Sequence, residues 1–157
     1  MKIEKVMTRD AHVCSPADTM NHAAQMMWEG DCGFLPVVDG GRVVGVVTDR
    51  DICMGAYTQG VPLWGAPVAS VMSNELWTCR PGDDIRDVEG LMKEKMIRRV
   101  PVVDPEGALV GVVTIGDLAR CTQSNPVQKA AAGLAITKTL ATICRPRAHE
   151  DSRAAAE

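Results

Sequence analysis

The chain contains an internal repeat that covers most of its 157 residues, and this repeat limits the folds that the sequence can adopt. Residues 6–39 align with residues 71–104 at a constant offset, which pairs VM with VM, Cys14 with Cys79 and PVVD with PVVD. One extra residue in a turn follows, and then VVGVVTDRD at 43–51 aligns with LVGVVTIGD at 109–117. So many matches in the same order indicate two copies of one structural unit.

Each copy predicts the same order of elements. A short apolar stretch (12–14 and 76–79) ends at a turn with proline, after which Asp18 or Asp83 is placed to cap a helix. Apolar residues at helical spacing follow: Met20, Ala23, Ala24 and Met27 in the first copy, and Ile85, Val88 and Met92 in the second. Two β-branched runs joined by a glycine-containing turn then predict a hairpin. A second helix is expected over 51–57 and again over 117–122.

The sequence therefore predicts an α/β fold of two strand–helix–strand–strand–helix units. A unit of about 50 residues buries too little apolar surface to be stable alone, so the two should share a core around a pseudo-twofold axis, with two similar clefts between them. We expect unit 1 at 1–58, a linker at 59–68, unit 2 at 69–122 and a C-terminal helix and tail at 123–157. The helix is expected over 127–143, started by Asn125 and Pro126. The sequence leaves open whether it packs on its own subunit or on a partner.

Composition limits the classes of function. The net charge of −3 argues against direct nucleic-acid binding or attraction to an anionic membrane. The N-terminus has no apolar signal segment and no run approaches the length of a membrane span, which predicts a cytoplasmic protein without membrane contact. The six cysteines form no CxxC pair, and the three histidines do not lie near them at the spacing of a zinc site. We therefore expect no metal site, and we expect the thiols to be reduced.

The repeated Thr-x-x-Asp stretch supports two interpretations, which the residues alone leave open. Thr48 with Asp51, and Thr114 with Asp117, fit a capping box at a helix start. The same corner offers free N–H groups to a phosphate, while the carboxylate can accept hydrogen bonds from a ribose diol. Two glycines in the preceding strands permit close backbone approach beside the cleft: Gly45 and Gly111.

Taken together, the paired VM-(T/S), P-x-D, PVVD and GVVTxxD motifs resemble a tandem of cystathionine-β-synthase (CBS) domains, often called a Bateman module. The resemblance covers about residues 1–121 and implies two βαββα units around a pseudo-twofold axis. Such pairs typically bind AMP, ADP, ATP or S-adenosylmethionine, and sometimes NAD, and they often form homodimers. The resemblance therefore implies a regulatory module with no catalytic residues and no catalytic cofactor. Such a module would signal through a downstream protein, which the sequence does not identify.

The resemblance also implies roles for particular residues. Asp51 and Asp117 would bind ribose, and Thr48 and Thr114 would bind ribose or phosphate. The remaining expected binding residues lie beside these four or along the adenine pocket: Val13, Cys14, Arg50, Thr78, Cys79 and Gly116.

The two copies differ where phosphate-binding members of the family carry basic residues. The second copy has Arg98 and Arg99 before its PVVD strand, whereas the first has Gly33 and Phe34. Guanidinium groups match phosphate oxygens, so we predict that the Asp117 cleft accepts a nucleotide phosphate. The Asp51 cleft, with only Arg50 nearby, should bind more weakly, bind a less charged adenosyl group, or stay empty. The alternative is an ion pair of Arg99 with Asp104 or Glu106 across the hairpin.

Two other functions compete with the nucleotide sensor. The protein could be a dimeric scaffold whose clefts bind nothing, with Thr-x-x-Asp acting only as a cap. A thiol switch centred on Cys14 and Cys79 is the weaker alternative, because nothing nearby in sequence would depress a thiol pKa. Small apolar side chains in a tight interior are the simpler interpretation of both cysteines.

Overall fold

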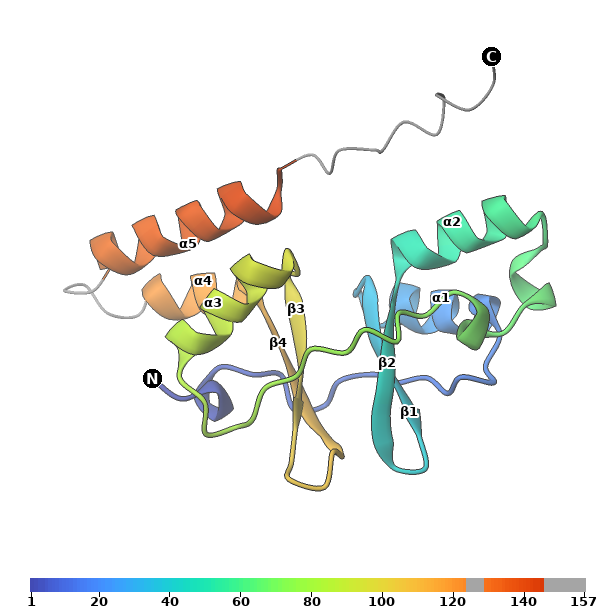
Figure 1. The fold of residues 1–157 in the computed structure, drawn as a ribbon, viewed down its shortest axis with the longest axis horizontal. Coiled ribbons are helices and arrows are strands. Elements are labelled where there is room, and N and C mark those ends of the chain that lie inside the picture. The colour runs from blue at the N-terminus through green and yellow to red at the C-terminus, as the bar shows by residue number, and fades with distance from the viewer. Residues whose placement is uncertain (124–128, 146–157) are drawn as a thin grey trace, which may run out of the picture.

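The computed structural model describes residues 1–123 and 129–145, and side chains within this part except over 122–132. Two hairpins lie beside each other at the centre, with helices at both ends of the molecule (Figure 1). The helices and strands, in chain order, are α1 (Met20–Glu29), β1 (Phe34–Asp39), β2 (Arg42–Thr48), α2 (Asp49–Gln59), α3 (Ile85–Lys95), β3 (Arg99–Val103), β4 (Leu109–Thr114), α4 (Ile115–Gln123) and α5 (Lys129–Ile143). The predicted mixed α/β fold is confirmed.

The two hairpins are equivalent in detail. β1 pairs antiparallel with β2, and β3 pairs antiparallel with β4. The register shifts between Val37 and Val38 in the first hairpin, and between Val102 and Val103 in the second. Since these positions correspond in the repeat, the two copies share the irregularity as well as the strands, and the predicted hairpins are confirmed.

The stretches before the first helix of each unit depart from prediction. Instead of a full strand, each forms a single parallel bridge, Cys14 to Val37 and Cys79 to Val102. The predicted helix caps Asp18 and Asp83 are also wrong. Their carboxylates accept the N–H groups of Ser15 and Arg80, at 2.7 Å in both cases. This bond closes the proline turn, so the helices begin one residue later, with Thr19 and Asp84 as their N-caps.

The N-terminal segments of the two units are exchanged. Thr8 pairs with Val112 of the second hairpin, and Ser73 pairs with Val46 of the first. Figure 1 shows the blue N-terminal segment starting beside the second hairpin and crossing to α1, and the green connector crossing back to α3. Ile3 is fully buried in the second unit's core. Each unit is therefore completed by a segment that precedes the other unit's first helix.

This exchange explains the two glycines of the GVVT strands. A Cβ at Gly45 would lie 2.7 Å from the carbonyl oxygen of Ser73, and one at Gly111 would lie 2.7 Å from that of Thr8. Such contacts are closer than side chains tolerate, so only glycine admits the crossing backbone. The close approach expected at these glycines is confirmed, but its partner is the exchanged segment.

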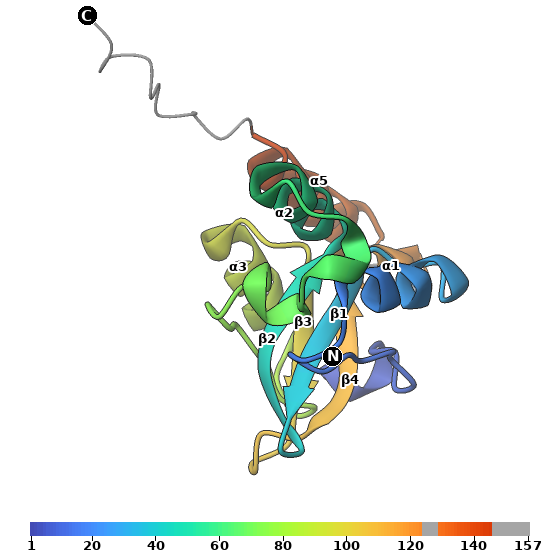
Figure 2. The same cartoon turned by 90° about the vertical axis from the view of Figure 1, so that its right-hand side faces the viewer.

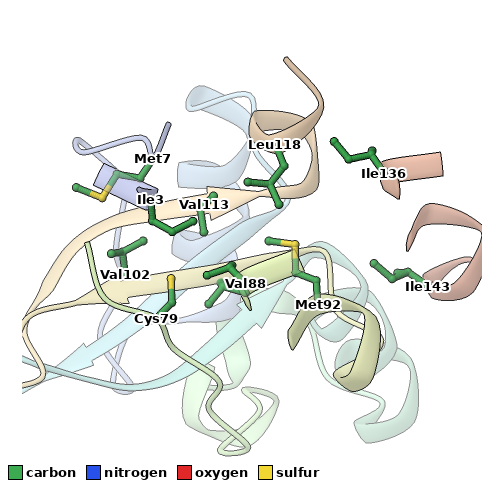
Figure 3. Packing of buried hydrophobic residues seen from close by; sticks show 11 residues of the cluster. Ile3, Met7, Cys79, Val88, Met92, Val102, Val113, Leu118, Ile136 and Ile143 are labelled. Atoms are coloured by element: carbon green, nitrogen blue, oxygen red, sulfur yellow. The ribbon is translucent and has the colours of Figure 1, made fainter. Parts of the chain in front are cut away.

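α5 packs on its own subunit, against α3 and α4. Ile136 and Ile143 enter the second unit's core beside Met92 and Leu118 (Figure 3). Thr139 is buried and donates its hydroxyl to Glu89 of α3 at 2.6 Å. The start expected at Asn125 and Pro126 lies outside the described residues. Within 1–123 and 129–145, no helix combines the length and apolar character needed to cross a membrane.

Candidate functional site

The Thr-x-x-Asp stretch of the first unit caps α2. The Thr48 hydroxyl accepts the N–H of Asp51 at 3.2 Å, and Oδ2 of Asp51 accepts the N–H of Thr48 at 2.9 Å and its hydroxyl at 2.7 Å. Both halves of a capping box are present, so the capping interpretation is confirmed here. Oδ1 of Asp51 takes no part in these bonds. The neighbouring Arg50 is exposed.

The second unit repeats this geometry at the start of α4. Oδ2 of Asp117 accepts the N–H of Thr114 at 2.7 Å and its hydroxyl at 2.8 Å. Asp117 is only 7% exposed, and its Oδ1 binds the guanidinium of Arg120 one turn later. Gly116 lies in sequence between Thr114 and Asp117 and is half-buried. The sequence analysis missed Arg120, although an acid and a base three residues apart in a helix are a recognised pairing signal.

Arg99 connects this corner to the other unit. Its backbone lies opposite Thr114 in the ladder, as Phe34 lies opposite Thr48. Its guanidinium carbon lies 6.0 Å from the centroid of the Phe34 ring. Arg98 is exposed, and its carbonyl accepts the N–H of Ile115 at 2.9 Å. Arg99 therefore points to the boundary between the units, whereas Arg98 is exposed.

In the part of the chain that the structure describes, neither predicted alternative partner, Asp104 or Glu106, pairs with Arg99. Asp104 accepts the N–H groups of Glu106 and Ala108, at 3.1 and 2.8 Å, and so closes the turn between β3 and β4. Across the described residues no ion pair joins Arg99 to Asp104 or Glu106. The hypothesis of an ion pair across the hairpin is therefore wrong.

The expected adenine-side residues lie farther along the hairpins. Cys14 and Cys79 each donate their N–H to the proline carbonyl of the neighbouring strand, at 3.1 Å. Cys79 pairs with Val102, three residues along β3 from Arg99, which is roughly 10 Å at strand spacing. Thr78 is half-buried and Val13 is 37% exposed. The structure thus separates these positions from the Thr-x-x-Asp corners by about half a strand's length.

Two cavities adjoin the units. The first, of 460 Å³, lies at the hairpin turns, where Thr78 and Cys79 meet charged side chains: Arg42, Arg80, Asp83, Asp104 and Glu106. The second, of 680 Å³, lies between α1 and α2 and is mostly apolar. Neither cavity is lined by Asp51 or Asp117. Arg42 and Arg80 come from different units, and their meeting at this cavity was not predicted.

Burial raises the pKa of the two interior thiols, Cys14 and Cys79. Burial, together with the charge of Asp18, raises the pKa of Cys14 to about 11, and burial with Asp83 raises that of Cys79 to about 12. All six cysteines lie in the described residues, and none forms a disulfide. A protonated buried thiol is a poor nucleophile, which argues against a switch at these two positions. In the part of the chain that the structure describes, no three His, Cys, Asp or Glu side chains gather as a metal site.

Comparison with known proteins agrees with this geometry. The family model described as "CBS domain" matches residues 3–55 and 68–123. The CBS domain-containing protein YhcV of Bacillus subtilis is 38% identical over 135 residues, which are 86% of this chain and 92% of that protein. Hypoxic response protein 1 of Mycobacterium tuberculosis is 33% identical over 132 residues, covering 83% of this chain and 85% of its own. The solved structure of CBSX2 in complex with AMP superimposes with a TM-score of 0.69, at 28% identity, over 78% of this chain and 96% of its own.

Proposed function

The chain belongs to the CBS domain family, and we propose that it is a regulatory module that binds an adenine nucleotide at the Asp117 corner and reports its occupancy to a partner protein by a change in shape. CBS domain pairs serve as ligand-binding regulatory modules, and one similar structure holds AMP. We infer that such a module passes its response to a partner through protein contact.

The observation that carries the proposal is the position of Arg99. Arg99 as a residue is half-buried, its guanidinium lies near the Phe34 ring of the other unit, and among the described residues no carboxylate pairs with it. A partly buried cation without a counter-charge attracts anions, and the guanidinium fork binds two phosphate oxygens at once. Because Arg99 lies opposite Thr114, a phosphate held by Arg99 would also lie close to the N-terminus of α4.

Asp117 can supply the sugar contact without losing its cap. Its Oδ2 belongs to the capping box, whereas its Oδ1 binds Arg120, whose side chain is 74% exposed. Because Arg120 is exposed, its guanidinium can return to water while the hydroxyls of a ribose diol donate to Oδ1 in its place. Arg120 would then be free to meet the nucleotide's phosphates.

The first corner lacks these features. Phe34 takes the place of Arg99, and Arg50 points to solvent. We infer that the Asp51 corner binds no phosphate with useful affinity and accepts at most an uncharged adenosyl group. Occupancy of one site per chain is the expected stoichiometry.

The test is calorimetric titration of the full chain with adenosine, AMP, ADP, ATP, S-adenosylmethionine and NAD. We expect a nucleotide carrying phosphate to bind more tightly than adenosine, and Asp117→Ala to abolish binding while Asp51→Ala leaves it. A nucleotide that binds only the folded state should also raise the melting temperature. Equal affinity for adenosine and AMP, or equal loss in both Asp variants, would refute the site assignment.

A specific observation favours a second function, that of a scaffold with empty clefts. Both Thr-x-x-Asp carboxylates are engaged in caps, and both cavities lie elsewhere. In this case no member of the ligand panel would shift the melting temperature of the wild type, and Asp51→Ala and Asp117→Ala would differ from it only in stability.

A further inference from the structure

Two of the six cysteines lie at one accessible cavity of the first unit. Cys32 follows the end of α1 and Cys53 lies near the middle of α2, and both line the 680 Å³ cavity between these helices. Figure 2 looks onto this end of the molecule, with α1 and α2 in front. Cys32 is half-buried and Cys53 is exposed, whereas Cys14 and Cys79 are enclosed in the two cores. Small molecules in solution can therefore reach this pair of thiols.

The end of α1 holds Cys32 at the cavity. Asp31 has a left-handed backbone, with φ of 46°. The N–H of Asp31 donates to the carbonyl of Trp28 at 3.4 Å, and the N–H of Cys32 donates to that of Met27 at 2.9 Å. Two such bonds across a left-handed residue form a Schellman motif, which folds the following residue back onto the helix. Cys32 therefore packs against the first core, which includes Met27.

A backbone contact brings Cys32 close to the helix that carries Cys53. The carbonyl of Gly33 accepts the N–H of Asp49 at 3.4 Å, so the residue next to Cys32 touches the first residue of α2. Asp49 and Cys53 are four residues apart on one face of α2, with about 5–6 Å between their Cβ atoms. Both of these residues line the cavity. A disulfide spans Cα atoms about 4.4–6.8 Å apart, so bonding the two thiols draws the sides of the cavity together.

The second unit forms the same structure without either thiol. Ile97 occupies the place of Cys32 and follows a left-handed residue, Met96, with its N–H bonded to the corresponding helix carbonyl at 3.0 Å. Ala119 occupies the place of Cys53. The repeat thus builds this helix end and this pair of helices with other side chains, so packing does not account for two thiols at one cavity.

We propose that Cys32 and Cys53 form a reversible disulfide, with a low-molecular-weight disulfide as the oxidant. The Cys53 thiolate, which is the more exposed, attacks a sulfur of the small disulfide; a mixed disulfide forms and one small thiol leaves. The Cys32 thiolate then attacks the Cys53 sulfur, which closes the protein disulfide and releases the second small thiol. Two electrons pass from the cysteines to the small disulfide, and the two cysteine protons end on the released thiols. Excess small thiol reverses both steps.

The charge of the cavity selects the oxidant. Its charged lining residues are both acidic, Asp31 and Asp49. Their field repels anions, so cationic cystamine should oxidise the pair faster than anionic oxidised glutathione at low ionic strength. Equal rates for the two reagents would overturn the assignment of the reaction to this cavity. The modification does not depend on nucleotide binding, because the proposed nucleotide corner lies in the other unit.

The experiment treats the reduced full chain with uncharged bis(2-hydroxyethyl) disulfide, blocks the remaining thiols with iodoacetamide and identifies linked peptides by mass spectrometry. We expect one bond within the chain, between Cys32 and Cys53, which dithiothreitol reverses. Cys32→Ser and Cys53→Ser should each stop at a mixed disulfide on the remaining thiol. The matched control is Cys144→Ser, which removes another exposed cysteine and should form the bond like the wild type.

Thermal unfolding tests whether the folded state accommodates the bond. A disulfide that closes a loop of about 20 residues restricts the unfolded chain, so oxidation should raise the melting temperature of the wild type and of Cys144→Ser by roughly 5 °C or more. Neither Cys32→Ser nor Cys53→Ser should show this increase. Mixed disulfides that persist on the wild type, bonds between two chains, or an unchanged or lower melting temperature after oxidation would each overturn the proposal.

Discussion

The guanidinium of Arg99 lies over the ring of Phe34, its central carbon 6.0 Å from the ring centroid, and the two residues occupy equivalent positions of the repeat. The two hairpins therefore meet at the same residue of each copy, as a pseudo-twofold axis requires. The chemistry at this meeting point is nevertheless unequal, since one copy contributes a cation and the other an aromatic ring. This inequality is the physical basis for expecting one phosphate site per chain.

Substitution of Arg99 should separate phosphate binding from adenosine binding. Arg99→Ala removes a charge-assisted contact worth about 1.5–3 kcal/mol, so we expect roughly 10- to 150-fold weaker binding of AMP in calorimetric titration. Adenosine affinity should change little. The matched control is Arg98→Ala, whose side chain is exposed; if it weakened AMP binding as much as Arg99→Ala, the phosphate contact would be misassigned.

The cap at α2 should act on stability alone. Thr48→Val removes both hydrogen bonds of the Thr48 hydroxyl, one of which is half of the capping box, and should lower the free energy of unfolding by about 1 kcal/mol. Urea denaturation measures the loss, and AMP affinity should be retained because the proposed site lies in the other unit. Thr58→Val, an exposed helix position whose hydroxyl binds a carbonyl of its own helix, serves as the comparison and should change stability by less than about 0.5 kcal/mol.

The crossing segments make two glycine substitutions opposite in effect. Gly45→Ala places a methyl group against the carbonyl of Ser73, which the backbone cannot avoid without moving, so we expect a loss of about 1–3 kcal/mol. Gly90 of α3 has open space around it, and Gly90→Ala should gain about 0.5–1 kcal/mol from helix propensity. Equal effects of the two variants on thermal unfolding would contradict the exchange.

Alkaline pH should destabilise the fold through the buried thiols. The pKa values of Cys14 and Cys79 are raised from 9.0 to about 11 and about 12, so the unfolded chain releases these protons first as pH rises. Stability is therefore retained below pH 9 and lost above it, at about 1.4 kcal/mol per pH unit for each thiol. Urea denaturation of the Cys14→Ala, Cys79→Ala double variant should start from lower stability but show a shallower decline between pH 9 and 11. An identical slope in both proteins would exclude this mechanism.

The two faces of α5 should respond differently to truncation. Ile136 is 7% exposed and packs in the second unit's core, so Ile136→Ala should cost about 2–5 kcal/mol. Leu134, two residues earlier, points outward, and Leu134→Ala should leave the stability of the monomer within about 0.5 kcal/mol. Both values are measured under conditions in which the chain is monomeric. A large loss for Leu134→Ala would mean that α5 is rotated about its axis.

Local periodicity predicted most of the fold. Apolar residues three to four positions apart predict the helices, and apolar residues two positions apart predict the strands of the hairpins. Both patterns occur in each copy of the repeat. Asp18 and Asp83 were misassigned because an aspartate before a helix can equally close the preceding turn, and the choice depends on the backbone. The exchange of Ile3 and Val68 between cores was also beyond prediction, since a short apolar segment does not specify which of two nearly identical units it completes.

At the candidate site, the sequence predicted where the two Thr-x-x-Asp stretches lie in the fold, but not which side chains their carboxylates and the nearby arginines contact. Thr114 and Asp117 are brought together by their own helix start, so spacing suffices to predict them. The contact of Arg99 with Phe34 depends on how the units face each other, and the Arg120 bond to Asp117 depends on a rotamer. Such interactions depend on how the two units pack in three dimensions. The repeat in the sequence indicates that the units are related by symmetry, but it does not give the contacts between them.

The exchange of end segments also bears on how the chain is made. The edge of the first hairpin lacks its partner until Ser73 has been synthesised, and Ile3 reaches its core only after the second hairpin has been synthesised. A nascent chain that contains only the first repeat is therefore incompletely folded and has exposed strand edges. Cutting the connector between the two copies would therefore separate segments that pair with each other across the copies.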